Sequence, residues 1–172
     1  MQTSFANSLI MAPYYVGEVQ NQSISQRTGH LAGEVIPFGS PLYYDTTNNV
    51  VKKMAANGTN PFFGIAARVL HESVGGTVSS TANTPVMSLT TNSSGYAIND
   101  VVSVLKMGTI VVNINAVTDA LVGVNIFWKK TDATLYAAST NASIGNDILI
   151  GNAIIKPAVG LVPITLVSMP QV

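Results

Sequence analysis

The chain has 172 residues, no cysteine, and eight acidic against eight basic side chains. Only 9% of its residues are charged, against about 25% in an average soluble domain. The length suits one domain with its own core, and the lack of cysteine excludes disulfides, thiolate metal sites and cysteine nucleophiles. Zero net charge argues against nucleic acid as a partner. The chain contains no run of 18 apolar residues, so no membrane span is expected.

The low number of charged residues leaves the surface of the protein with little charge. A protein with so little charge repulsion tends to associate, so we interpret the composition as a sign that other protein covers much of it. A surface of Asn, Thr and Ser that water solvates is the alternative. The first residues lack a positively charged segment, so a secretory signal is not expected.

The first sixteen residues are uncharged and rich in large apolar side chains, without a helix cap, a turn or clear alternation. We expect an extended N-terminal arm over residues 1–16 that docks on a partner. Residues 17–172 show short apolar runs separated by turn signals, which predict a single all-β domain, either an antiparallel β-sandwich or a small β-barrel.

The first half of this domain begins with a predicted hairpin. Residues 40–45 and 50–54 are strand-like, and Asn48-Asn49 between them tolerates left-handed backbone. Residues 60–70 form a further strand candidate with Gly64 as a bulge or close approach. Residues 73–95 carry no charge and are expected to form a long loop or hairpin insertion, with a strand over 85–90.

The stretch "YAINDVVSVLKMGTIVVNI" (Tyr96–Ile114) predicts two strands that turn back on each other at Met107-Gly108. In the second of them Ile110, Val112 and Ile114 share one face, as expected of a sheet that covers a core.

The second half repeats the pattern. A hairpin is predicted from residues 122–130 and 134–139, followed by strands at 148–156 and 162–169. "PLYYD…FFGIAARV" and "NIFWK…LIGNAIIK" resemble each other, so that Gly64 and Ala66 match Gly151 and Ala153. Two strands of similar register in opposite sheets would explain the match, and so would chance.

No catalytic, metal or cofactor site is predicted. Several acids stand in turn-like contexts, Asp45, Asp132 and Asp147 among them, and turn capping explains them better than acid–base catalysis. His30 and His71 lack a supporting nucleophile motif and metal-ligand spacing. We therefore expect no enzyme and no cofactor.

Phe127 and Trp128 are neighbours in a predicted strand. Their side chains should therefore point to opposite faces, one into the core and one to the surface or an interface.

Several of these segments, in order, resemble the structural cement, or head decoration, proteins of tailed bacteriophages. The likeness covers most of the chain from Val16 onward. Asn99 stands where the family usually has glycine, and "NIFW" replaces its Pro-Val-Tyr type of turn. The segments that carry the likeness are "VGEVQNQSISQRTGHLAGEVIPFGSPLYY" (Val16–Tyr44), "PFFGIAARV" (Pro61–Val69), "YAINDVVSVLKMGTIVVNI" and "ALVGVNIFWKKTDATL" (Ala120–Leu135).

The resemblance implies a viral structural protein, made in the host cytoplasm, that joins the exterior of the mature capsid and stabilises it by bridging major capsid protein subunits. It also implies a homo-oligomer, with a trimer favoured. The alternatives are another β-rich virion component, such as a head-fibre base or tail protein, and a carbohydrate-binding module. The candidate partner-binding residues lie in the arm: Phe5, Leu9, Ile10, Met11, Tyr14 and Tyr15.

Overall fold

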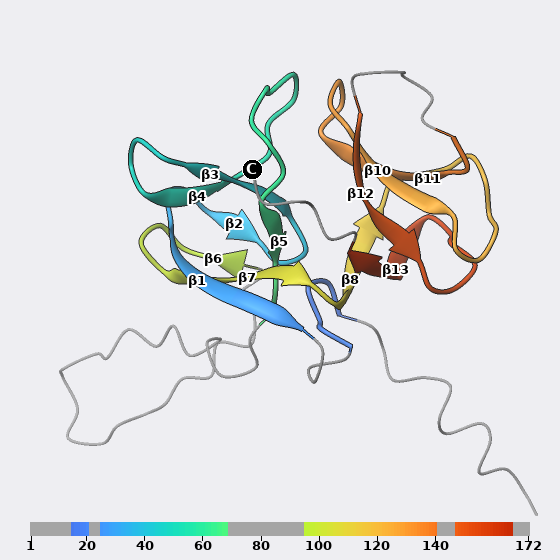
Figure 1. Cartoon of the computed structure of the whole chain (residues 1–172), viewed down its shortest axis with the longest axis horizontal. Helices are drawn as coiled ribbons and strands as arrows, with labels where there is room; N and C mark the ends of the chain where they lie inside the picture. Colours follow the sequence, from blue (N-terminus) through green and yellow to red (C-terminus); the bar gives the residue numbers. More distant parts are fainter. Residues whose placement is uncertain (1–14, 21–24, 69–94, 141–146, 167–172) are drawn as a thin grey trace, which may run out of the picture.

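The computed structural model describes residues 15–20, 25–68, 95–140 and 147–166, and in these ranges every regular element is a strand (Figure 1). No helix there is long and apolar enough to cross a membrane. The strands are β1 (Gln26–Ala32), β2 (Ile36–Pro37), β3 (Pro41–Asp45), β4 (Val50–Lys53), β5 (Gly64–Ala66), β6 (Gly95–Tyr96), β7 (Val101–Met107), β8 (Thr109–Ile114), β9 (Ala116–Val117), β10 (Asn125–Lys129), β11 (Thr134–Ala138), β12 (Ile148–Ala153) and β13 (Gly160–Leu166).

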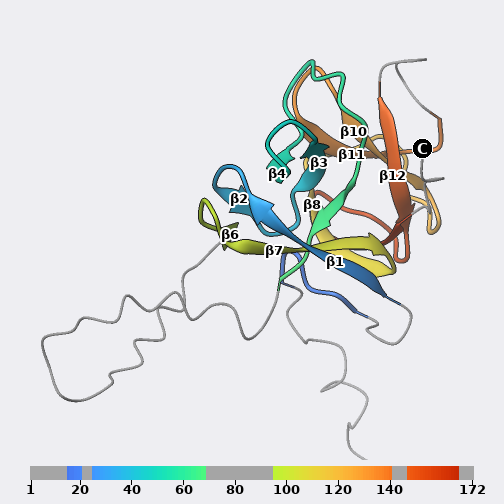
Figure 2. The ribbon, with the colours of Figure 1, turned by 60° about the vertical axis from the view of Figure 1, so that its left-hand side comes forward.

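The strands form two lobes, seen side by side in Figure 1 and from a second direction in Figure 2. In the first lobe, five strands close into a barrel in the order β1-β4-β3-β5-β7. In the second, six strands form a sheet in the order β8-β13-β12-β10-β11-β9. The prediction of an all-β fold is confirmed, in its barrel form, with parallel pairs between β1 and β4 and between β9 and β11. The predicted strand at 85–90, and the insertion up to residue 94, lie outside the described residues.

The six-stranded sheet curls into a second barrel-like unit, because its two edge strands are consecutive in the chain. Ile114 ends β8 and Ala116 begins β9, with only Asn115 between them. The N–H of Asn115 donates to the carbonyl of Leu135 in β11 at 2.8 Å, so the link between β8 and β9 is itself hydrogen-bonded to the sheet.

The predicted hairpin at Met107-Gly108 is wrong. β7 pairs with β1 and β5, whereas β8 pairs with β13, so the chain runs from one barrel straight into the other. A tight hairpin needs two central residues of suitable backbone, and here only Gly108, with φ at 124°, lies between the strands. The predicted apolar face of β8 is confirmed, since Ile110, Val112 and Ile114 are fully buried.

The two barrels repeat one design. A hairpin of two strands with a four-residue turn, β3–β4 and β10–β11, is followed by a strand that pairs back onto its first member, β5 and β12. Leu42 pairs with Gly64 in the first barrel, and Ile126 pairs with Gly151 in the second. The similarity of the two glycine strands therefore reflects equivalent register.

The equivalence extends to the turns. Asn49 and Ala133 close the two hairpin turns, and both have positive φ, 54° and 53°. The prediction of left-handed backbone at the Asn48-Asn49 turn is thus confirmed at its second residue. Asn99, at the position that the resemblance assigns to glycine, also has a positive φ of 70°.

One apolar core joins the barrels. Ile65 and Leu105 belong to the first barrel but lie in the same buried cluster as Ile110, Trp128 and Ile164 of the second. A separate cluster that includes Leu42, Val51 and Val104 fills the first barrel. Because interiors pack as densely as organic crystals, a shared cluster fixes how the barrels lie against each other.

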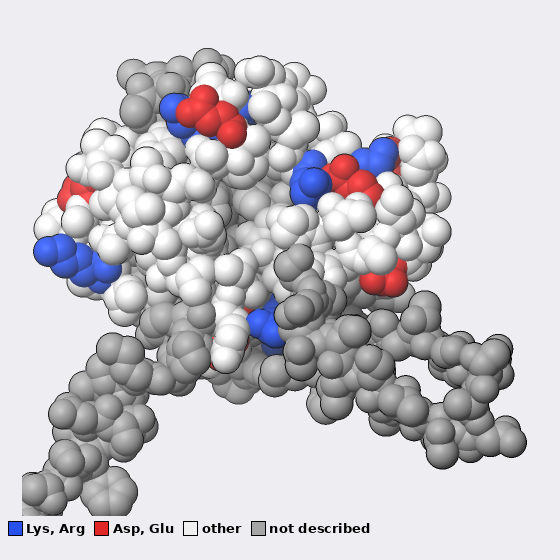
Figure 3. Space-filling model, turned by 180° about the vertical axis from the view of Figure 1, so that it is seen from behind, with Lys and Arg blue, Asp and Glu red and all other residues white. Residues whose placement is uncertain are grey.

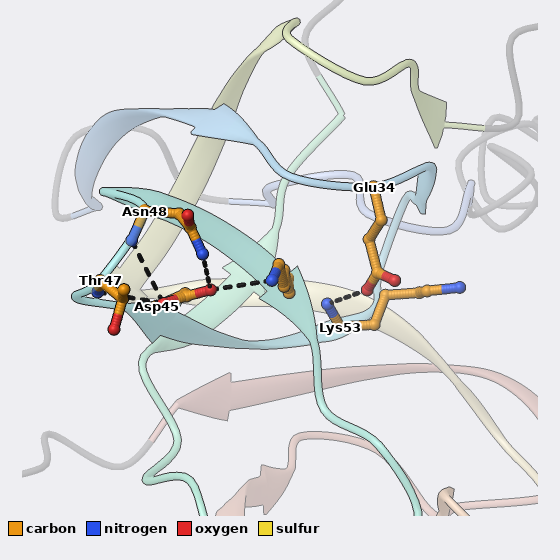
Figure 4. Close-up of polar contacts among 6 residues, drawn as sticks. Glu34, Asp45, Thr47, Asn48 and Lys53 are labelled. Atoms are coloured by element: carbon orange, nitrogen blue, oxygen red, sulfur yellow. Dashed lines mark hydrogen bonds and ion pairs between the residues drawn. The ribbon is translucent and has the colours of Figure 1, made fainter.

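The β3–β4 turn is held by one carboxylate (Figure 4). Asp45 accepts hydrogen bonds from the backbone N–H groups of Thr47 and Asn48, at 3.0 and 3.3 Å, and from the Asn48 amide at 2.9 Å. The Lys52 ammonium donates to it at 2.8 Å. Lys52 first, then Asn48, hold the pKa of Asp45 well below its ordinary value. Turn capping by Asp45 is confirmed.

We predict that Gly64→Ala and Gly151→Ala each destabilise the protein by about 1–3 kcal/mol, because overpacking forces backbone to move. A methyl group at Gly64 would lie 2.7 Å from the Leu105 carbonyl oxygen, and one at Gly151 would lie 2.3 Å from that of Thr165. Thermal or denaturant unfolding measures the loss.

The matched control is Gly29→Ala in β1, where the nearest atom would be a Val101 methyl at 3.3 Å. That side chain is half exposed and free to shift. Equal losses for Gly29→Ala and the two glycines of the repeat would contradict the argument from close backbone approach.

We predict that Asp45→Asn lowers stability at neutral pH and that its difference from the unchanged protein shrinks in acid. The folded pKa is depressed, so the contribution is complete above the unfolded value and is lost as pH falls below about 4. Unfolding midpoints from pH 7 to 2 measure it. Asp119→Asn is the control, since that carboxylate has no hydrogen-bond partner among the described residues. A difference independent of pH would contradict the prediction.

Candidate interaction surfaces

A short N-terminal segment, residues 15–20, binds both barrels. The N–H of Gly17 donates to the Val111 carbonyl at 2.8 Å, and Val111 N–H donates to Glu18 at 2.9 Å. On the other side, Arg68 N–H donates to the Gly17 carbonyl at 2.6 Å. The segment therefore makes a turn at residues 15–18 and then a single antiparallel bridge to β8, between Val19 and Ile110, and it also contacts the chain that leaves β5.

The predicted arm, residues 1–16, leads into this segment and shares its first two residues. Tyr15 is 52% exposed, and the Arg68 guanidinium lies 4.9 Å from the centre of its ring, a cation–π contact. The other candidate contact residues lie outside the described residues: Phe5, Leu9, Ile10, Met11 and Tyr14.

A cleft of about 1080 Å³ lies between the barrels. Trp128 in its wall is buried, and its indole Nε1 is the one buried side-chain nitrogen or oxygen in the described part of the chain that lacks a hydrogen-bond partner. Buried polar groups are normally paired. The polar and aromatic residues of the lining include Tyr15, Glu34, Tyr43, Lys53, Arg68, Asn115 and Trp128.

The prediction that one of Phe127 and Trp128 would be exposed or at an interface is wrong, since they are only 6% and 5% exposed. Phe127 faces outward from its barrel but stacks on Tyr136, with ring centres 5.5 Å apart, and Leu149 packs beside them. A sugar needs an exposed ring to stack on, so Trp128 is not a carbohydrate platform.

Exposed aliphatic side chains gather at two ends of the molecule. At the end of the first barrel, the end patch consists of Leu31, Val35, Ile98 and Val101, which are 48–60% exposed. At the far end of the second barrel, the distal tip consists of Leu121, Val122, Ile154, Ile155 and Val159, which are 39–69% exposed.

The two loops of the distal tip are tied together. Gly123 N–H donates to the Ala153 carbonyl, and Ala153 N–H donates to the Val124 carbonyl, both at 2.9 Å. The tip is therefore a single surface, and its side chains are presented by ordered backbone.

Charged side chains are few and scattered. In the face that Figure 3 shows, white dominates, and most of the acids lie beside bases. Asp45 pairs with Lys52, and Asp132 pairs with Lys129, which lowers the pKa of Asp132. Asp147 accepts hydrogen bonds from the Tyr136 hydroxyl at 2.8 Å and from Lys130 N–H at 3.3 Å. These acids hold turns and strands together.

The titratable residues form no reactive cluster in the described ranges, where no three of His, Asp or Glu gather as metal ligands would. The His30 ring packs edge-on against Tyr44 and Phe63 and hydrogen-bonds Thr28 at 3.1 Å. Burial, followed by the charge of Lys106, lowers the His30 pKa. His30 is thus part of the packing, and His71 lies outside the described residues.

Residues 1–167 match a family model described as "Structural cement protein (E217 gp24/Pam3 gp6)". No curated protein matches significantly. The crystal structure of the head fiber gp8.5 N base in bacteriophage phi29 is similar with 13% identity and a TM-score of 0.46, over 86% of this chain and 98% of that one. The match of the family model over nearly the whole length shows that the chain belongs to the phage structural cement protein family, whose members are not enzymes.

Proposed function

We propose that this protein attaches to the exterior of the mature tailed-phage capsid and stabilises it by bridging major capsid protein subunits. The observation that carries the proposal is membership of the cement family. A described surface with few charges, two exposed aliphatic ends and no reactive cluster supports it. The protein is made in the host cytoplasm and acts on the assembled particle.

In the proposed mechanism the protein stabilises the capsid by binding to it. A ligand that binds the mature lattice and not its opened form stabilises that lattice by mass action, by about 2.7 kcal/mol per site at a hundredfold excess over Kd. The burial of apolar surface drives such binding. The shared core supports this role, because a rigid pair of barrels transmits load between the subunits that it joins.

The proposal includes self-association, with a trimer favoured, and contact through the arm. The arm residues Phe5, Leu9, Ile10, Met11, Tyr14 and Tyr15 add an extended segment to the capsid or to a neighbouring copy. Residues 17–20 support an arm that adds to a sheet edge, because Gly17, Glu18 and Gln20 already form backbone hydrogen bonds with β8.

We expect purified full-length protein, mixed with empty expanded capsids, to pellet with them at saturating stoichiometry and to raise their disruption temperature. Unexpanded shells are the control. The protein should bind them weakly, because the sites form only on expansion. Equal binding to both shells, or binding without a gain in heat resistance, would contradict the cementing role.

We predict that a variant with four apolar arm residues changed to Ser binds the capsid at least tenfold more weakly, a loss of about 1.4 kcal/mol or more in binding free energy. The residues changed are Phe5, Leu9, Ile10 and Met11. The matched control changes the polar residues Gln2, Ser4, Asn7 and Ser8 to Ala in the same arm and keeps its length. Pelleting titrations compare the two. Unchanged binding by the apolar-to-Ser variant would show that the arm is not a contact.

A further inference from the structure

The ends of the two barrels have equivalent backbone hydrogen bonds. At the first, Ser40 N–H donates to Pro37 at 3.3 Å; at the second, Val124 N–H donates to Leu121 at 3.3 Å. Each turn has a glycine of positive φ at its third position, Gly39 at 74° and Gly123 at 82°, as a type II turn requires.

The strand that follows the glycine motif repeats the pattern. Ala67 N–H donates to the Ser103 carbonyl at 2.8 Å, and its counterpart Ile154 N–H donates to the Pro163 carbonyl at 3.1 Å. Together with the turns, these bonds align the end of the first barrel, loop by loop, with the distal tip of the second.

The next backbone hydrogen bond, one residue further along, is made in the first barrel and not in the second. In the first barrel, Arg68 N–H donates to the Gly17 carbonyl at 2.6 Å, so the N-terminal segment seals this end. The counterpart of Arg68 is Ile155, which is 39% exposed and whose N–H has no backbone acceptor in the described ranges.

The exposure of the side chains differs between the two turns in the same way. Phe38, at the second position of the first turn, is only 9% exposed, because Tyr96 packs on it with ring centres 5.2 Å apart and Gly17 lies against it. Its counterpart Val122 is 68% exposed. One repeat is therefore covered by a short N-terminal piece of this chain, and the equivalent site on the other repeat is bare among the described residues.

We infer that the distal tip is a docking site for residues 1–14 of a second copy of this chain. These residues immediately precede the segment that covers the first barrel, and they contain no charged side chain. An uncharged segment suits an aliphatic surface because no charge has to be removed from water. Fourteen extended residues reach roughly 45 Å, which suffices to leave one molecule for the next.

In this docking, a carbonyl of the arm accepts the Ile155 N–H as Gly17 accepts that of Arg68. Large side chains of the arm, such as Leu9 and Ile10, cover Leu121 and Val122. The inference deepens the self-association in the proposed function, and its test uses the free protein without capsids, so either can fail alone.

The first test places benzoylphenylalanine at Val122 in the full-length protein. An equal mixture of unlabelled and 15N-labelled copies is irradiated, and the cross-linked peptides are sequenced by mass spectrometry. We expect cross-links to residues 1–14, with half of them joining a labelled to an unlabelled chain. Cross-links only within one chain, or to other segments, would overturn the inference.

The second test compares two double variants by sedimentation velocity. Leu121→Ser with Val122→Ser should lower the association constant at least tenfold, as should removal of residues 1–14. The matched control, Val35→Ser with Ile98→Ser, changes similarly exposed side chains (60% and 56%, against 66% and 68%) in the end patch and should leave association intact.

Unfolding midpoints verify that all variants fold. A wild-type monomer at all concentrations would overturn the inference, as would a distal-tip variant that associates normally. A distal-tip variant that associates normally but loses capsid binding would assign the tip to the capsid protein instead.

Discussion

The structure depends on an apolar cluster shared by two barrels. β7 ends one barrel and passes through Gly108 directly into β8 of the other, so the covalent chain enforces a contact that Ile65, Leu105 and Ile110 then bury. Each fully buried Ile or Leu contributes about 1.5–3 kcal/mol. A two-lobed protein with this much common interior behaves as one rigid body, and this rigidity suits the proposed role of holding capsid subunits together.

The repeated design explains both the similarity and the difference of the lobes. Gly64 and Gly151 lie where neighbouring backbone leaves no room for a side chain, and Gly39 and Gly123 turn the equivalent loops. The lobes diverge where the chain covers them. The first barrel is sealed by residues 15–20, by the β2–β6 pair and by Tyr96, whereas the second presents its aliphatic distal tip. Because the equivalent ends of the two barrels differ in how they are covered, the two ends of the molecule can bind different surfaces.

Much of the fold could be predicted from local signals. Turn residues and β-branched runs gave both hairpins, the apolar face of β8 and the capping role of Asp45. The sequence did not reveal which strands pair across long distances, so β7 and β8 were expected to form a hairpin when they belong to different barrels. The burial of Phe127 depends on Tyr136 and Leu149, which reach it only through tertiary packing. The distal tip was missed for the same reason: its aliphatic side chains look like core residues until the structure shows them uncovered.

The cementing role is tested most directly by electron cryomicroscopy of expanded capsids with and without added protein. The account predicts a two-lobed density on the outer surface, over the junctions between major capsid protein subunits, with lattice features otherwise unchanged. Density confined to the tail or to a single vertex, or density that touches one capsid subunit without reaching a second, would contradict it.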